Sequence, residues 1–141
     1  KEDVVISLSA PSKIPVEWLD QAKAKVNIHC GKFPKYAGMM PIFWQIHDSL
    51  DEISITLHDL AEEIDTGKVF LERKIKLSHS LYETSRLAKR QSAYLLKEFL
   101  ANVESNIEKA KGKQFFREEI VLRKFPTKKE IKEFKKIYKL I

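Results

Sequence analysis

The sequence predicts an α/β protein, and three observations support this class. Short apolar, β-branched runs alternate with segments that have the period of a helix, in the order β-α-β-α-β-β-α. Hydrophobic residues make up 43% of the chain and aromatic residues 10%, which is typical of a folded domain. The length of 141 residues is enough for one domain with its own core.

The first half of the chain predicts two strands, two short helices and a loop. Residues 4–8 form an apolar, β-branched run that indicates a buried strand. Pro15 suits the first turn of a helix that continues to Leu19. Residues 26–29 read as a second strand, and the glycines and proline that follow predict a loop. Residues 41–47 are expected to form a helix.

The second half predicts an antiparallel pair of strands followed by a long helix. Residues 53–57 and 69–77 alternate apolar and polar side chains, which is the pattern of half-buried strands. The turn sequence Asp65-Thr66-Gly67 separates them, so we expect the two strands to pair. Ser80 and Glu83 have the spacing of a capping box at the start of a helix over 81–103.

The last part of the chain predicts a strand over 114–122 and a final helix. Thr127 and Glu130 have capping-box spacing, and Ile131, Phe134 and Tyr138 would line one face of that helix. The formal net charge is +6, and lysines are concentrated in this region. Such a region is either a solvated helix face or a surface for a polyanion, and composition leaves both open.

Composition also bears on the cellular compartment. Cys30 is the only cysteine, so no intrachain disulfide is possible, which fits a reducing cytoplasm. No apolar run is long enough to span a bilayer, and no secretory signal is visible. We therefore expect a cytoplasmic protein that does not enter the membrane.

Three polar residues lie where strands give way to loops. Asn27 and His29 are two apart on a predicted strand, so their side chains share a face, and a Gly/Pro loop follows. Asp65 lies at the turn between two other strands. An amide, an imidazole and a carboxylate can bind an oxyanion and transfer protons, although each residue type is also common in purely structural roles. The spacing of His47, His58 and His79 with Cys30 is unlike that of metal ligands, so we expect no metal.

Two separated motifs resemble the folate-dependent formyltransferase family. The first is Asn27-Ile28-His29, followed by a Phe-Pro-Lys-Tyr-Ala-Gly loop over 33–38 and by Pro41-Ile42. The second is Asp65-Thr66-Gly67, at the distance from His29 that the family pattern has. The family includes methionyl-tRNA formyltransferase, phosphoribosylglycinamide formyltransferase and nucleotide-sugar N-formyltransferases.

The resemblance implies a fold and a division of the chain. It implies part of a formyltransferase-type, Rossmann-like sheet with flanking helices, whose N-terminal half is missing from this chain. Residues 1–110 would be the C-terminal half of the catalytic core, and residues 111–141 a basic extension made of a strand and a helix. An apolar edge or face of the sheet should then be exposed.

The resemblance also implies a reaction and the residues that perform it. The donor would be 10-formyltetrahydrofolate, and Asn27, His29 and Asp65 would be catalytic. The folate pocket would be lined by Leu8, Ser9, Ile14, Ala61, Glu62, Glu63 and Ile64. The acceptor would be a primary amine on a nucleotide-linked sugar, on methionyl-tRNA or on phosphoribosylglycinamide. The alternative is a non-catalytic folate-binding fragment or subunit that needs a partner to complete the sheet, and a homo-oligomer is left open.

Overall fold

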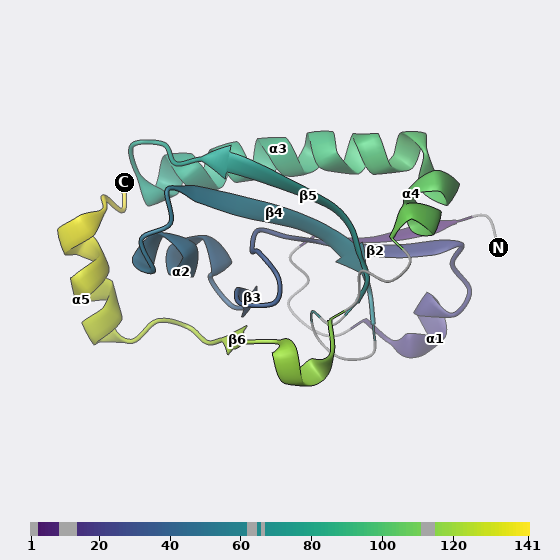
Figure 1. Cartoon of the computed structure of the whole chain (residues 1–141), viewed down its shortest axis with the longest axis horizontal. Helices are drawn as coiled ribbons and strands as arrows, with labels where there is room; N and C mark the ends of the chain where they lie inside the picture. The colour runs from purple at the N-terminus through teal and green to yellow at the C-terminus, as the bar shows by residue number, and fades with distance from the viewer. Residues whose placement is uncertain (1–2, 9–13, 62–64, 66, 111–114) are drawn as a thin grey trace.

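A four-stranded sheet forms the centre of the molecule (Figure 1). The computed structural model describes residues 3–8, 14–61, 65, 67–110 and 115–141. The strand order is β1-β2-β4-β5. β1 (Val4–Leu8) is parallel to β2 (Ala24–His29), while β4 (Glu52–Asp59) is antiparallel both to β2 and to β5 (Val69–Lys76). The predicted antiparallel pairing of the two strands that flank Asp65 is confirmed.

Helices pack on this sheet, which confirms the α/β class. α3 runs along β4 and β5, and α2 packs against β4 and α3. A single helix was predicted over 81–103, but Asn102 adopts a non-helical backbone and divides it into two. The helices are α1 (Val16–Leu19), α2 (Pro41–His47), α3 (Leu81–Ala101), α4 (Val103–Lys109) and α5 (Lys128–Ile137).

Both predicted helix caps are present. The Ser80 hydroxyl accepts a hydrogen bond from the backbone N–H of Glu83 at the start of α3. The Thr127 hydroxyl accepts one from Glu130, whose carboxylate accepts from the Thr127 N–H in return. Each cap satisfies backbone donors that the first helical turn leaves without a partner.

The main core lies between the sheet and the helices. Alternate residues of β4 point into it, and Ile53, Ile55 and Leu57 have no exposed surface. Phe99 of α3 and Phe134 of α5 are also completely buried in this cluster. The division of the chain at residue 110 stays a prediction, and α5 contributes to the same core as the sheet.

A second, two-stranded parallel sheet joins the C-terminal segment to the loop after β2. β3 (Ala37–Gly38) pairs with β6 (Leu122–Arg123). Of the strand predicted over 114–122, only Leu122 is found in a strand, β6, because Arg117–Glu119 form a short 3-10 helix, η1. There the Glu119 side chain and backbone bond back to Phe116, so these backbone groups are satisfied locally. Gln114 lies outside the described residues.

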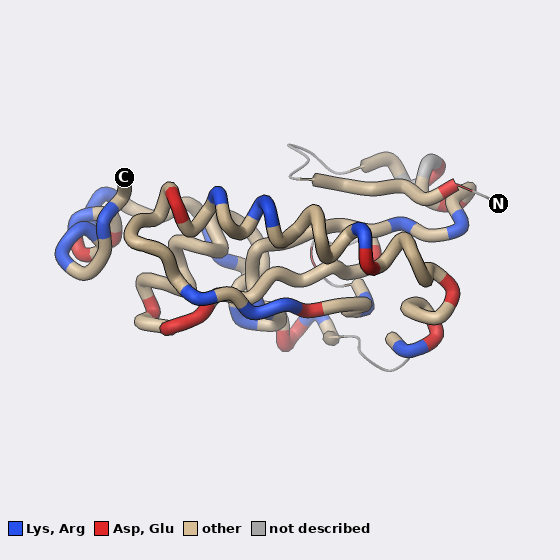
Figure 2. Tube along the Cα trace, turned by 90° about the horizontal axis from the view of Figure 1, so that it is seen from above, with Lys and Arg blue, Asp and Glu red and all other residues tan. Residues whose placement is uncertain are grey.

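The C-terminal helix is strongly basic. Lysines gather on α5, at the end of the molecule opposite the N-terminus (Figures 1 and 2). The lysines of α5 are exposed, whereas Phe134 faces inward. Within the part of the chain that the structure describes, no helix is both long enough and apolar enough to cross a membrane.

The β1 edge of the sheet has no neighbouring strand among the described residues. Ile6 and Leu8 lie on one face of β1 and are 38% and 61% exposed. The expected exposed apolar edge is therefore present, and the prediction that the strand over residues 4–8 is buried is wrong, since only Ser7 of β1 is buried.

Candidate active site

Four polar side chains meet where β2 and β4 lie side by side. Asn27 and His29 come from β2, His58 comes from β4, and Asp65 comes from the connection between β4 and β5. His29 Nδ1 lies 3.8 Å from Asp65 Oδ2, and His58 Nε2 lies 3.6 Å from Asp65 Oδ1. Asn27 Nδ2 lies 3.1 Å from His58 Nε2. The structure thus brings the three predicted residues together around a fourth.

His29 is held through one ring nitrogen. Its Nε2–H donates to the carbonyl oxygen of Tyr36, 2.6 Å away, and the ring is 8% exposed. A carbonyl oxygen can only accept, so Nε2 carries a proton and Nδ1 is the nitrogen that faces Asp65. The Phe33 ring stacks on His29 with centroids 5.3 Å apart and also meets the His58 ring edge-on.

Gly31 leaves the space that this arrangement requires. A Cβ at this position would lie 2.3 Å from the Tyr36 carbonyl oxygen and 2.5 Å from His29 Nε2. Any larger residue would therefore push apart His29 Nε2 and the Tyr36 carbonyl oxygen, the two atoms of this hydrogen bond. The Gly31 carbonyl oxygen itself accepts a hydrogen bond from the Thr56 hydroxyl on β4.

His58 is buried and neutral. Burial lowers its pKa from 6.5 to about 4, although the charge of Asp65 acts in the opposite direction. Its Nδ1–H donates to the carbonyl oxygen of Asp59 at 2.8 Å, so Nε2 is left with a lone pair. That lone pair accepts from the Asn27 side-chain amide and fixes the orientation of the amide.

Asp65 reaches the cluster from a left-handed backbone conformation with φ of 58°. Aspartate tolerates this conformation better than most residues do. Its carboxylate is buried and accepts a hydrogen bond from the Gly38 N–H at 2.8 Å. Asp65 is six residues beyond the end of β4, and so it lies within the connection rather than directly at the end of a strand.

His58 is the site residue that the sequence analysis missed. In the sequence, His58 is only a possible metal ligand, and its spacing from the other candidates is unlike that of metal ligands. The available signal was the pairing of the strands, because His58 lies directly opposite Asn27 in the sheet. Nothing in the sequence gives that register, which depends on how β2 and β4 align.

The predicted folate residues are only partly described. Leu8 is exposed at the end of β1, and Ile14 and Ala61 are half-buried. Ser9 and Glu62, Glu63 and Ile64 lie outside the described residues. Among the residues that the structure does describe, no group of three or more His, Cys, Asp or Glu side chains is arranged to hold a metal ion.

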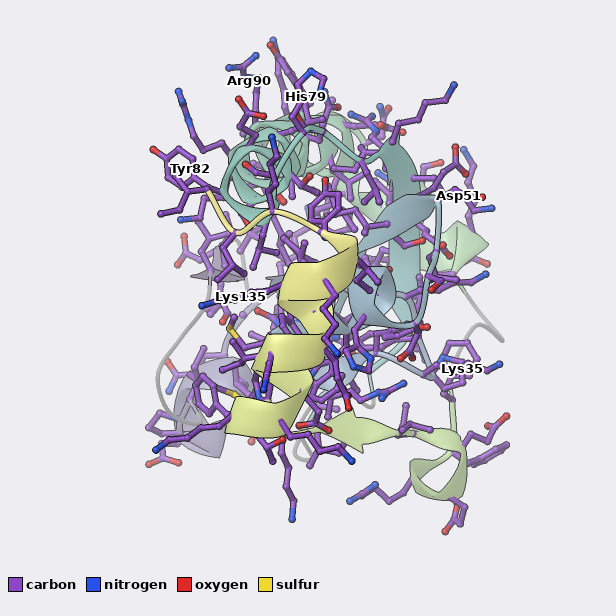
Figure 3. All side chains as sticks on the ribbon, turned by 90° about the vertical axis from the view of Figure 1, so that its left-hand side faces the viewer. Lys35, Asp51, His79, Tyr82, Arg90 and Lys135 are labelled. Carbon is purple, nitrogen blue, oxygen red and sulfur yellow. The ribbon has the colours of Figure 1, made fainter. Side chains whose placement is uncertain are left out.

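Two shallow cavities lie elsewhere, at the N-terminal end of α3. One is lined by His79 and Tyr82 and the other by Arg90, and Figure 3 shows these side chains at that end of the molecule. None of the four clustered residues lines either cavity.

The fold, the half-buried amide and the buried imidazoles and carboxylate define an α/β protein with a candidate site for oxyanion binding and proton transfer. A family model described as "Formyl transferase" matches residues 2–100, which is more than half of the chain. The chain belongs to the formyl transferase family.

The names of two relatives specify different formyl acceptors. A methionyl-tRNA formyltransferase from Lachnospira eligens is 28% identical over 76 residues, covering 53% of this chain and 24% of the relative. A GDP-perosamine N-formyltransferase from Brucella melitensis is 32% identical over 79 residues, covering 55% of this chain and 30% of the relative. The matched segment thus spans less than a third of the length of either relative.

A solved structure supports the fold. The formyltransferase PseJ from Anoxybacillus kamchatkensis, in complex with a UDP-linked formamido sugar and tetrahydrofolate, superposes with a TM-score of 0.63. It is 21% identical, and the match covers 74% of this chain and 56% of PseJ. The Rossmann-like formyltransferase fold predicted above is confirmed.

Proposed function

We propose that this chain carries the catalytic residues for formyl transfer from 10-formyltetrahydrofolate to a primary amine. Membership of the formyl transferase family supports the reaction class. The observation that carries the proposal is the cluster in which Asp65 lies within reach of both His29 and His58, and Asn27 bonds to His58.

The residues present suit a formyl donor. Attack by an amine on a formyl carbon places negative charge on the formyl oxygen and leaves a proton on the nitrogen to be removed. The cluster offers an amide N–H donor and the charge of a protonated His29 for the first task, and a carboxylate for the second. The donor, when bound, supplies the formyl group.

Asn27 is the proposed oxyanion donor. One N–H of its side-chain amide is directed to His58 Nε2, which fixes the amide plane and leaves the second N–H for the substrate oxygen. Because the pKa of His58 is depressed, its Nε2 stays an acceptor at neutral pH. A preorganised donor of this kind lowers the barrier because it needs no reorientation during the reaction.

His29 and Asp65 form the proposed proton-transfer pair. His29 Nε2 is bonded to the Tyr36 carbonyl oxygen, so Nδ1 is the nitrogen directed at the carboxylate. When His29 is protonated, its charge would stabilise the developing oxyanion, and Asp65 would stabilise that charge. Asp65 would also accept the proton from the attacking amine, directly or through water. Collapse of the intermediate would then break the bond between the formyl carbon and N10 of the donor, and N10 would take up that proton as tetrahydrofolate leaves.

The proposed folate-binding segments flank this cluster in the sheet. Leu8 pairs with Ile28, between Asn27 and His29, and Ala61 follows β4. The remaining proposed residues are Ser9, Ile14, Glu62, Glu63 and Ile64. The acceptor is a nucleotide-linked amino sugar or methionyl-tRNA, since both kinds of relative match to a similar extent.

A second candidate function is a folate-binding subunit that requires a partner to complete its sheet. The exposed β1 edge, with Ile6 and Leu8 uncovered, favours it. The cytoplasmic location and a homo-oligomeric state also stay predictions.

The decisive experiment replaces His29 by Ala in the full natural chain. We expect turnover with 10-formyltetrahydrofolate and an amine acceptor to fall roughly 100-fold or more, because a transition-state interaction is lost. The affinity for tetrahydrofolate should change by no more than about twofold, because that interaction contributes little in the ground state.

The matched control is His79→Ala, since His79 is exposed and lies outside the cluster. Its turnover should equal that of the wild type. If His29→Ala keeps most of its activity, the catalytic assignment is wrong. If activity and folate affinity fall together, His29 binds or supports the donor instead.

A further inference from the structure

The loop that holds the proposed catalytic residues is itself held by the C-terminal segment. Two backbone groups of this loop contact the cluster: the Tyr36 carbonyl accepts from His29, and the Gly38 N–H donates to Asp65. The positions of both side chains therefore depend on the path of residues 36–38.

β6 fixes that path through backbone pairing. Gly38 lies opposite Arg123, and the Met39 N–H donates to the Arg123 carbonyl oxygen at 2.9 Å. Two residues earlier, the Val121 N–H donates to Pro34 at 2.9 Å. The approach is close: a Cβ on Gly38 would lie 2.5 Å from the Arg123 carbonyl oxygen. The left-handed φ of +86° at Gly38 also favours glycine.

The side chain of Arg123 adds contacts that backbone pairing alone does not give. Its guanidinium lies over the Tyr36 ring, 5.3 Å from the centroid, and over the Trp44 ring at 5.2 Å. Its Nε donates to the Lys35 carbonyl oxygen at 3.3 Å, and a terminal nitrogen donates to Asp48 at 2.6 Å. The Tyr36 hydroxyl also donates to Asp48, at 3.2 Å. One side chain thus joins the loop to α2 and to the segment just beyond it.

We propose that Arg123 is a positioning residue, which orders Tyr36–Gly38 and thereby fixes the protonated nitrogen of His29 and the carboxylate of Asp65. This inference rests on the proposed formyl transfer for its catalytic consequence. Its structural part, the control of the His29 hydrogen bond, is measurable without any substrate.

The experiment compares Arg123→Gln with Arg73→Gln in the full natural chain. Arg73 is a fair control because its guanidinium also pairs with a carboxylate, Glu98, and its side chain is 31% exposed against 26% for Arg123. Proton NMR follows the His29 Nε2–H, which exchanges slowly with water while it is bonded to Tyr36. We expect this resonance in the wild type and in Arg73→Gln, and its broadening or loss in Arg123→Gln.

The kinetic counterpart separates positioning from binding. Arg123→Gln should lower kcat about tenfold to 100-fold with little change in KM for the folate donor, because misplacement of a reacting group acts on the chemical step. Arg73→Gln should leave both constants unchanged. Asp48→Asn keeps the ring and Lys35 contacts of Arg123, so it should broaden the His29 resonance and lower kcat less than Arg123→Gln does. It takes the place of Arg123→Gln if that variant does not fold.

The two proposals fail in different ways. An unchanged His29 resonance in Arg123→Gln, or an equal effect of Arg73→Gln, would overturn the positioning role. A wild-type chain with the expected resonance pattern but no formyl transfer to any amine would instead overturn the proposed function.

Discussion

At the scale of single residues, two opposing effects act on the pKa of His58. It is 2% exposed, so its charged form is penalised, yet it lies beside the carboxylate of Asp65, which favours that form. Burial has the larger effect, and the pKa falls to about 4. The proposed orientation of Asn27 depends on this outcome, since only the neutral ring can accept the amide N–H.

This pKa predicts how stability depends on pH. Between pH 6.5 and about 4 the unfolded chain takes up a proton at His58 that the folded chain refuses, so stability falls as the pH falls through this window. The full shift of the His58 pKa corresponds to a loss of roughly 3 kcal/mol in the free energy of unfolding. Urea unfolding of the wild type and His58→Gln at pH 4 and pH 7 measures it: the variant should lose less stability on acidification. Equal losses in both proteins would show that His58 titrates normally.

At the scale of elements, α5 has one completely buried side chain, Phe134, which attaches it to the core. Phe134 has no exposed surface and stacks on Phe43 of α2, with ring centroids 4.4 Å apart. The Tyr138 hydroxyl, one residue beyond the helix, bonds to Thr84 on α3 at 3.0 Å. The basic residues of α5 stay exposed while this one face is buried (Figure 3).

Phe134→Ala should therefore lower the free energy of unfolding by about 3–5 kcal/mol, the usual cost of deleting a buried aromatic ring. Ile137→Ala on the same helix is the control, because Ile137 is 57% exposed. Its effect should stay within about 0.5 kcal/mol. Chemical denaturation measures both, and similar values for the two variants would mean that α5 does not pack on α2 as described.

The elements that could be predicted from sequence are those whose signals are local. The alternating residues of β4, the proline that starts α2 and the caps of α3 and α5 each act within a few residues. β3 escaped prediction, and β6 overlaps the predicted strand only at Leu122, because each has two residues and exists only through pairing with a distant segment. The apolar residues around 115–122 suggested a strand, but local bonds around Glu119 form a short helix instead.

The same reasoning applies to the candidate site. Asn27, His29 and Asp65 could be found because they belong to recognisable motifs. His58 and Arg123 could not be found in this way. The place of His58 in the site depends on strand register, and that of Arg123 depends on a contact with Lys35, 88 positions away in the sequence.

At the scale of the whole molecule, the open β1 edge predicts self-association. Ile6 and Leu8 present apolar surface beside backbone groups that no described strand pairs. Analytical ultracentrifugation should show a mass that rises with concentration for the wild type, and a monomer for Ile6→Lys combined with Leu8→Lys.

Tyr94→Lys is the control, since Tyr94 is 55% exposed on α3, away from this edge. It should associate as the wild type does. A wild-type chain that remains monomeric at every concentration would mean that the edge is protected.

The pairing of β3 with β6 has a consequence for the order of events during synthesis. The ribosome releases His29 and Tyr36 long before it adds Arg123, and contacts between such distant positions form late in folding. The sheet can begin to form on the emerging polypeptide, but the loop beside His29 has no β6 to pair with until residues 122 and 123 have been added. A product interrupted before residue 122 would then retain much of the sheet while the loop that contacts His29 and Asp65 lacks the strand that orders it.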